Sequence, residues 1–354
     1  MAKILMKGNE AIGAAAIKAG CKYFFGYPIT PQNELPEYMS KELPKIGGVF
    51  VQAESEVAAI NMLYGGAGTG ERVMTSSSSP GIALKQEGIT YIAGAELPCV
   101  IVNMSRGGPG LGGIQPSQAD YFQSTRGGGN GDYRLLVYAP ASIQEAVDLV
   151  IEAFDAADYY RNPVMVLGDG MIGQMMEPVE FREPETKREI PAKDWATTGT
   201  NEAREPNIIN SLYLAPEALE EHNIRLNEKY KEMEANEVRY ETYKMEDAEI
   251  VMVAYGTTAR IVKNAIDVLE SEGIKAGLIR PITLWPFPYA AFKEIPETTK
   301  ALLSVEMSMG QMIDDIKIGI EGRLPVEFYG RSGGMIPTPE AVIEKVKDIL
   351  GGAK

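Results

Sequence analysis

Short apolar runs alternate with stretches of helical periodicity along the first half of the chain. Strands are predicted at residues 21–28, 47–53, 71–81, 97–105, 133–140 and 163–170, the third ending in a serine-rich turn. Helices are predicted at residues 9–20, 54–70, 85–96 and 142–160. The run at 97–105 is almost wholly apolar, which is typical of a strand covered on both faces. This alternation predicts a parallel α/β sheet.

A second, smaller α/β unit is predicted near the end of the chain. Its strands are expected at residues 248–257, 275–282, 301–307 and 325–330, and its helices at 259–273, 288–300 and 338–350. Between the units, Pro, Glu and Lys are enriched at residues 177–195, as in a linker or extended arm. We therefore expect domains at residues 1–180 and 248–354, joined by an arm with a charged helix at 181–247.

Composition narrows the classes of function. A chain of 354 residues has room for two or more domains, and its net charge of -15 argues against a nucleic-acid surface. The two cysteines, Cys21 and Cys99, cannot build a four-thiolate iron–sulfur or zinc site. No apolar run approaches the length of about 18 residues that a membrane span needs, and the first residues lack the pattern of a signal peptide. We expect a cytoplasmic protein without nucleic-acid or membrane partners.

The single histidine, His222, lies in a charge-dense helical stretch. A solvated helix face is the expectation for such a position. This largely excludes Ser-His-Asp triads and zinc sites built on histidine. The chemistry must depend on carboxylates, arginine, hydroxyl groups or a cofactor.

Several polar residues fall at the carboxyl ends of predicted strands. They are Thr30, the glutamates Glu54 and Glu56, the serine run 76–79 and Arg106. Ligands in open parallel sheets bind at this edge, so the convergence predicts a binding site there.

Two prolines flank Thr30 in the segment GYPITP. Proline fixes its own φ and keeps the preceding residue extended, so Pro28 and Pro31 make this loop stiff. Thr30 and Pro31 also fit the N-cap and first position of a helix, which Pro36 would kink or restart. A plain strand-to-helix turn is the alternative interpretation.

The segment GDGMIG at residues 168–173 matches a dinucleotide-binding fingerprint after a predicted strand. The residues that follow do not predict a helix, so no helix N-terminus is expected to receive a pyrophosphate. Gly168, Asp169 and Gly170 also resemble the start of the diphosphate and Mg²⁺ motif of thiamine diphosphate enzymes. The paired asparagines that should follow are missing, since only Asn201 is present. No metal site is predicted in this chain.

Two glycine-rich segments begin with an arginine, at Arg106 (106–113) and Arg126 (126–132). Such loops can cover a ligand while the arginine binds a carboxylate, although long surface turns have the same composition. Neither segment is a P-loop, because no Gly-Lys-Ser/Thr follows.

The ordered set of motifs resembles the α subunit of the 2-oxoacid:ferredoxin oxidoreductases. The segments are GYPITP, ESEVAAINMLYGGAGTG, TSSSSPGIALKQEGI, RGGPG, QPSQADYFQ and LIRPITLWPFP. The form YPITPQNELPEYM is most similar to the branched-chain, 2-oxoisovalerate type. The resemblance implies a thiamine diphosphate pyrimidine-binding-like domain followed by a transketolase C-terminal-like α/β domain.

The resemblance also implies the cofactors and partners. Thiamine diphosphate would be shared with a β subunit that supplies Mg²⁺ and diphosphate binding, and iron–sulfur clusters would lie only in partner subunits. Gamma and ferredoxin-like subunits would complete the complex. The reaction would be oxidative decarboxylation of a 2-oxoacid with coenzyme A to acyl-CoA and CO₂, reducing ferredoxin.

Site roles follow residue by residue from the same resemblance. Glu56 would hydrogen-bond the aminopyrimidine ring of the cofactor as the catalytic glutamate, with Glu54 as the alternative. Thr30 and Arg106 would bind the substrate. The other residues expected at the cofactor are Tyr27, Pro28 and Ile29.

Other functions remain open at this stage. The chain could act on 2-oxoglutarate or pyruvate instead. The second carboxylate of 2-oxoglutarate would need another cation, such as Arg126 or Arg331. A transketolase-like or decarboxylase chain should carry its own diphosphate motif. A non-catalytic assembly subunit would not need Thr30, Glu56 and Arg106.

Overall fold

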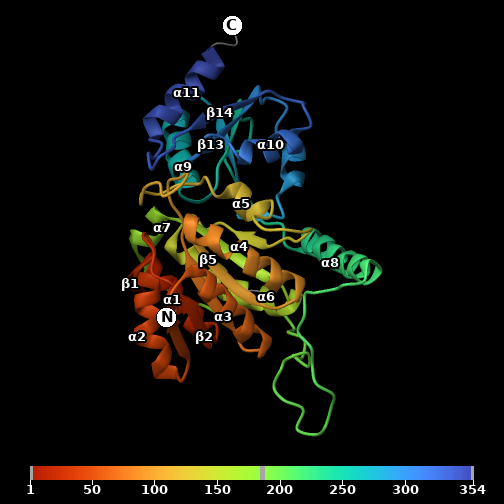
Figure 1. The fold of residues 1–354 in the computed structure, drawn as a ribbon. Helices are drawn as coiled ribbons and strands as arrows, with labels where there is room; N and C mark the ends of the chain where they lie inside the picture. The colour runs from red at the N-terminus through yellow and green to blue at the C-terminus, as the bar shows by residue number, and fades with distance from the viewer. Residues whose placement is uncertain (1–2, 184–187, 352–354) are drawn as a thin grey trace.

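A seven-stranded sheet forms the core of the lower part of the molecule in Figure 1. The computed structural model describes residues 3–183 and 188–351. The strand order is β12-β6-β7-β5-β4-β2-β3, and all neighbours are parallel except β12 and β6. The strands are β2 (Tyr23–Gly26), β3 (Val49–Gln52), β4 (Val73–Ser77), β5 (Cys99–Ser105), β6 (Leu136–Tyr138), β7 (Pro163–Asp169) and β12 (Thr283–Trp285). The predicted parallel α/β sheet is confirmed.

Helices cover this sheet on both faces. Every residue of β4, β5 and β7 is buried, as the apolar run at 97–105 predicted for β5. Helix α1 packs against α6, and α3 packs against α4. The helices of this unit are α1 (Gly8–Lys18), α2 (Glu34–Glu42), α3 (Glu56–Gly68), α4 (Ser79–Gly94), α5 (Tyr121–Thr125), α6 (Ile143–Tyr160), α7 (Gly170–Gln174) and the 3₁₀ helix η1 (Leu43–Ile46).

The helix after the GYPITP loop begins later than predicted. Thr30 is not its N-cap, because α2 starts at Glu34 with Asn33 as the flanking residue. Pro36 is the third helical residue and neither kinks nor restarts α2. The N–H groups of a first helical turn have no acceptor within the helix, so a proline there removes no hydrogen bond.

The upper unit in Figure 1 is a five-stranded sheet in the order β14-β13-β10-β11-β9. Its strands are β9 (Tyr240–Tyr243), β10 (Ile250–Val253), β11 (Ala276–Pro281), β13 (Ala301–Glu306) and β14 (Val326–Gly330). Its helices are α9 (Gly256–Ser271), α10 (Met312–Ile320), α11 (Pro339–Gly351) and the 3₁₀ helix η2 (Tyr289–Glu294). A helix was predicted at 288–300, but the helical segment ends at Glu294, the last residue of η2. Pro296 follows two residues later, and a proline cannot continue a helix. Helix α10 was not predicted.

Two short strands pair outside the part of the chain in which the sequence places them. β12 comes from the second half of the chain but pairs with β6 in the first sheet, while β9 precedes residue 248 and pairs with β11. A further two-stranded sheet joins β1 (Ile4–Lys7) to β8 (Met176–Val179). None of these short strands was predicted. The expected domain boundaries at residues 180 and 248 stay a prediction.

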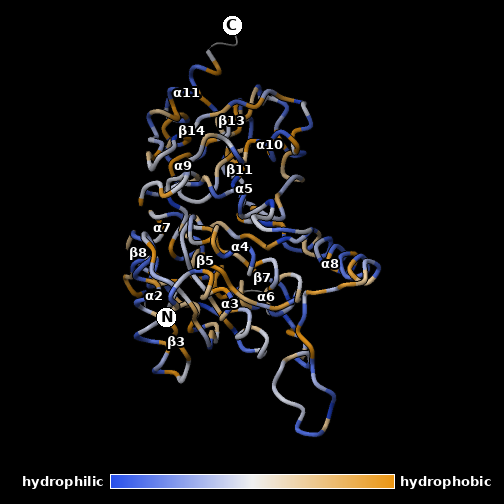
Figure 2. The backbone as a smooth tube through the Cα atoms, in the orientation of Figure 1, coloured by the Kyte–Doolittle hydropathy of each residue, from blue (hydrophilic) through white to orange (hydrophobic). Residues whose placement is uncertain are grey.

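Helix α8 (Pro216–Asn236) extends to the side of the molecule and is mainly hydrophilic (Figures 1 and 2). The prediction that His222 lies on a solvated face was wrong, because the side chain is only 3% exposed. Its Nε2 lies 2.7 Å from the carbonyl oxygen of Gly94, and its ring stacks on Tyr213. Although α8 is rich in charged residues, one of its faces is buried. This face consists of His222, Leu226, Tyr230 and Met233. His222 therefore ties α8 to the end of α4.

Within residues 3–183 and 188–351, none of the helices is long and apolar enough to cross a membrane.

Candidate functional site

The predicted site residues follow neighbouring strands of the first sheet. Thr30 lies in the loop after β2, and Glu56 opens α3 after β3. The serine run continues β4 into α4, and Arg106 comes directly after β5. Because β2, β3, β4 and β5 are parallel, these residues share one edge of the sheet.

Glu56 is the first residue of α3 and is 7% exposed, whereas Glu54 is exposed. Ser55 caps the helix by accepting a hydrogen bond from the N–H of Ala58 at 3.1 Å. Glu56 follows this cap as the first helical residue, where the positive end of the helix dipole stabilises a carboxylate. Of the two glutamates, Glu56 is the one held inside the protein.

Gly81 on α4 makes room for the Glu56 side chain. A Cβ at this position would lie 2.9 Å from Oε1 of Glu56 and 2.1 Å from Oγ of Ser77. No side chain fits into this space. Gly81 therefore allows α3 and α4 to bring a carboxylate and a hydroxyl group together at the end of β4.

Several buried polar atoms at the ends of β4 and β5 have no hydrogen-bond partner within the described part of the chain. They are Oγ of Ser77, Oγ of Ser78, Oδ1 of Asn103 and Nε of Arg106. Buried polar groups are nearly always hydrogen-bonded, because leaving one without a partner costs about 1–3 kcal/mol. This concentration at the ends of β4 and β5 fits a polar ligand that supplies the missing hydrogen bonds.

Arg106 connects the loops after β5 and β2. Its side chain is buried, Nη1 donates to the carbonyl oxygen of Thr30 at 2.9 Å, and Nη2 donates to that of Leu111 at 3.2 Å. Two of the five N–H groups of the guanidinium thus bind backbone, and Nε remains for a ligand. The structure brings Thr30 and Arg106 together, as their strand-end positions predicted.

Asp120 supports this loop and was not singled out from the sequence. Its Oδ2 accepts hydrogen bonds from Oγ of Ser79 at 2.6 Å and from Nδ2 of Asn103 at 2.9 Å. Burial raises the pKa of the Asp120 carboxyl despite these bonds. Oγ of Ser79 also accepts a hydrogen bond from the backbone N–H of Arg106 at 3.0 Å. Asp120 therefore fixes the start of the loop that carries Arg106.

The second unit holds the far end of the same loop through Gln118. The backbone N–H of Gln118 donates to the carbonyl oxygen of Met307 at 2.8 Å, and Nε2 donates to that of Tyr255 at 2.9 Å. Its Oε1 accepts from the backbone N–H of Met307 at 3.0 Å. The second unit thus contributes to the position of Arg106.

A groove of about 350 Å³ opens beside Thr30. It is lined by Thr30, Pro31, Ile114, Gln115, Pro116, Gly170, Met171, Gln174 and Ile336. Thr30 and Pro28 are exposed, and Tyr27 and Ile29 are partly buried. The loop of Arg331 reaches this region, since a Cβ on Gly334 would lie 2.4 Å from Cβ of Gln115. The lining is mostly apolar or neutral.

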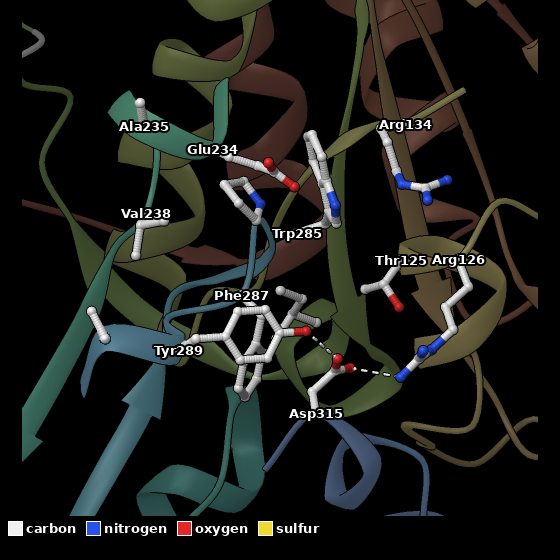
Figure 3. Close-up of a pocket in the computed structure, with 13 residues that line it drawn as sticks. Thr125, Arg126, Arg134, Glu234, Ala235, Val238, Trp285, Phe287, Tyr289 and Asp315 are labelled. Carbon is white, nitrogen blue, oxygen red and sulfur yellow. Dashed lines mark hydrogen bonds and ion pairs between the residues drawn. The ribbon is translucent and has the colours of Figure 1, made fainter. Parts of the chain in front are cut away.

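Arg126 lies in a different and larger cavity of about 710 Å³ (Figure 3). Its Nη2 pairs with Oδ2 of Asp315 at 3.1 Å, and Tyr289 donates to Oδ1 of the same carboxylate at 2.6 Å. This cavity shares no lining residue with the groove beside Thr30. Of the two extra cations considered for a second substrate carboxylate, Arg126 therefore lines another cavity and is already paired.

The structure corrects one expectation at GDGMIG. A short helix, α7, does follow β7, and Asp169 caps it by accepting hydrogen bonds from the N–H groups of Met171 at 2.8 Å and Ile172 at 3.1 Å. The helix was missed because it has only five residues. Its N-terminus is filled by the chain's own carboxylate, so a dinucleotide pyrophosphate has no place there.

Among the residues that the structure describes, no group of three or more His, Cys, Asp or Glu side chains could hold a metal ion.

Residues 14–249 match the family described as pyruvate flavodoxin/ferredoxin oxidoreductase, thiamine diphosphate-binding, and residues 248–342 match core domain II of pyruvate:ferredoxin oxidoreductase. The chain is 51% identical to the ketoisovalerate oxidoreductase subunit VorB of Methanothermobacter marburgensis, with 99% of both chains covered. It is 36% identical to the 2-oxoglutarate synthase subunit KorA of the same organism, over 96% of this chain and 97% of the relative.

Two solved structures share the fold. A 2-oxoglutarate:ferredoxin oxidoreductase from Magnetococcus marinus, with 2-oxoglutarate, coenzyme A and succinyl-CoA bound, superposes with a TM-score of 0.87 at 28% identity. The match covers 98% of this chain but spans only 65% of that longer one. A split-gene transketolase, described as an inactive β4 tetramer, superposes with a TM-score of 0.57 at 15% identity over 98% of both chains. This second likeness concerns the fold alone.

Proposed function

Because the chain belongs to the pyruvate flavodoxin/ferredoxin oxidoreductase family, we propose that it is the α subunit of a complex that oxidatively decarboxylates branched-chain 2-oxoacids. The preferred substrate is 2-oxoisovalerate, the products are acyl-CoA and CO₂, and ferredoxin takes the electrons. The observation that carries the proposal is the buried Glu56 against Gly81, beside serine hydroxyl groups that have no partner among the described residues. The ketoisovalerate subunit at 51% identity supports the choice of substrate.

The residues around Glu56 fit the aminopyrimidine half of thiamine diphosphate. Oε1 of Glu56 and Oγ of Ser77 meet at Gly81, and the buried Oγ of Ser78 and Oδ1 of Asn103 at the same edge of the sheet also have no partner among the described residues. A ring with donors and acceptors would supply the missing hydrogen bonds. When bound, this cofactor supplies the carbon nucleophile that adds to the 2-oxo group and the electron sink for decarboxylation. Mg²⁺ and the diphosphate belong to a β subunit, because Asp169, the acidic residue of GDGMIG, already caps α7.

Each site residue then has a distinct task. Glu56 holds a proton at the ring nitrogen of the aminopyrimidine, and Tyr27, Pro28 and Ile29 line the same cofactor. Arg106 binds the substrate carboxylate with the N–H groups that Thr30 and Leu111 leave free. Thr30 contacts the substrate from the stiff loop.

The rest of the complex supplies what this chain lacks. A β subunit carries the second half of the cofactor site and an iron–sulfur cluster, and gamma and ferredoxin-like subunits pass electrons to ferredoxin. Coenzyme A receives the acyl group. We place the complex in the cytoplasm.

Substrate competition in the assembled complex tests the proposal. Ferredoxin or viologen reduction is measured with 2-oxoisovalerate, 2-oxoglutarate and pyruvate, each with coenzyme A. We expect the highest kcat/KM for 2-oxoisovalerate, by at least about tenfold over 2-oxoglutarate. Although the loop of Arg331 comes near, neither Arg331 nor another described Lys or Arg lines the groove beside Thr30, and burying an unpaired second carboxylate costs several kcal/mol. A preference for 2-oxoglutarate would overturn the substrate assignment and leave the family unchanged.

Activity that survives loss of Glu56 would instead favour a non-catalytic assembly subunit. Turnover of Glu56→Gln in the assembled complex separates these two functions.

A further inference from the structure

Lys85 is a fully buried lysine next to the proposed cofactor site. It lies on α4, one turn after Gly81, and its side chain is 0% exposed. Nζ donates to Oγ1 of Thr75 at 2.7 Å and to the carbonyl oxygen of Ser76 at 3.1 Å. Both partners are on β4, directly before Ser77, whose Oγ meets Glu56 at Gly81. Nothing in the sequence pattern distinguishes this lysine from a solvated one.

Burial of this amino group is costly. Desolvation lowers the pKa of Lys85 from 10.5 to about 7, and the negative charge of Glu56 raises it against this effect. A leucine or methionine would fill the same space without such a cost. The packing of α4 therefore does not by itself require an amino group at this position.

Glu56 is the charged group that acts on Lys85 among the described residues. The two partners of Nζ on β4 are neutral. On α4 itself, Glu87 is exposed and bonds with Tyr91. Asp120, from the loop after β5, is bonded to Ser79 and Asn103. The carboxylate of Glu56 packs against Gly81. Gly81 lies one helical turn before Lys85, on the same face of α4.

We propose that Lys85 is a positioning residue for Glu56, a countercharge anchored on β4 that orients the Glu56 carboxylate toward the cofactor. The assignment rests on the proposed role of Glu56. Lys85 is charged below about pH 7 and neutral above it, so the countercharge is switched within the working range of an enzyme.

Titration of Lys85 in the full chain tests the coupling without cofactor or activity. Lysine side chains are labelled with ¹³C, and the Cε resonance of Lys85, identified by its absence in Lys85→Arg, is followed by NMR from pH 5 to pH 10. We expect a midpoint near 7 that falls by about one pH unit in Glu56→Gln. The resonance of Lys229, which pairs with Glu96, serves as the internal control and should not move. An unchanged Lys85 midpoint in Glu56→Gln would overturn the proposal.

Kinetics of the complex test the consequence for catalysis. We expect Lys85→Met to lower kcat about tenfold, with less than a twofold change in KM for the 2-oxoacid. It should also remove a step near pH 7 from the kcat profile. Lys85→Arg, which stays charged, should remove the step and recover part of kcat.

A wild-type pH profile retained in Lys85→Met would refute the positioning role. If Glu56→Gln is fully active while the NMR coupling is present, the proposed function fails and the charge pair stands.

Discussion

Nη1 of Arg106 donates a hydrogen bond to the carbonyl oxygen of Thr30 at 2.9 Å, joining two residues that are 76 positions apart. One belongs to the loop after β5 and the other to the loop after β2. The contact means that the cation proposed to bind the substrate carboxylate also positions the threonine proposed to touch the same substrate. A change at Arg106 should therefore disturb both parts of the site.

Arg106→Lys keeps the charge but cannot bind Thr30, Leu111 and a carboxylate at once, because an ammonium group lacks the planar set of donors. We expect kcat/KM for the 2-oxoacid to fall by roughly 100-fold, mostly through KM. Arg126→Lys is the matched control, since Arg126 lies in the separate cavity with Asp315, and its kinetics should stay near wild type. Equal losses in both variants would contradict the assignment of Arg106.

Glu56→Gln removes the carboxylate but keeps the size of the side chain. In the assembled complex we expect turnover to fall by roughly two to four orders of magnitude, the effect of losing a proton-transfer group. Subunit assembly, followed by size-exclusion chromatography, should be unchanged. Glu54→Gln changes the exposed neighbour and should alter turnover less than about twofold. Inactive Glu54→Gln beside active Glu56→Gln would reverse the assignment.

Gly81→Ala should damage the site through one methyl group. The new Cβ would lie 2.1 Å from Oγ of Ser77 and 2.9 Å from Oε1 of Glu56, so α3 and α4 must move apart. We expect thermal unfolding of the isolated chain to show a loss of about 1–3 kcal/mol, the usual cost of overpacking, and the complex to lose most of its activity.

Gly65→Ala is the control for this substitution. Gly65 lies on α3, and a Cβ there meets no atom within 4 Å. An alanine should stabilise the helix by up to about 1 kcal/mol. If Gly81→Ala behaved like Gly65→Ala, the proposed close approach would be absent.

The stability of the chain should depend on pH through Lys85. Its pKa is about 7 in the folded chain against the ordinary lysine value of 10.5, so the unfolded chain binds more protons between these limits. The free energy of unfolding therefore rises as the pH increases from about 7 to about 10.5, by several kcal/mol if Lys85 alone titrates. Chemical denaturation of wild type and Lys85→Met measures this, and the rise should be lost in Lys85→Met. The exposed Lys41→Met should retain it.

The isolated chain should contain no iron and should bind thiamine diphosphate weakly. Its two cysteines, Cys21 and Cys99, are buried and unpaired, and burial raises the pKa of both thiols, that of Cys21 to about 12. Neither is suited to ligate a cluster. Stoichiometric iron by elemental analysis, or tight cofactor binding by calorimetry without a partner, would count against the division of the site between subunits.

The sequence by itself determined the alternation of apolar strands and helices and the edge at which the site forms. Apolar periodicity is a local property, and parallel strands place their ends together whatever the details of packing. Thr30, Glu56 and Arg106 could therefore be grouped from their positions alone. The choice between Glu54 and Glu56 needed the fold, because both carboxylates stand at the same strand-to-helix junction and only the structure shows Glu56 buried and Glu54 exposed.

Only the tertiary structure decided which polar groups are buried and what they contact. Pairing of β12 with β6, and the bonds of Gln118 to Tyr255 and Met307, join segments more than 130 positions apart, so no local pattern contains them. His222 and Lys85 lie among residues that look solvated or helical in sequence, yet both are enclosed. Burial of a polar side chain depends on which elements pack over it, and that is a property of the whole fold.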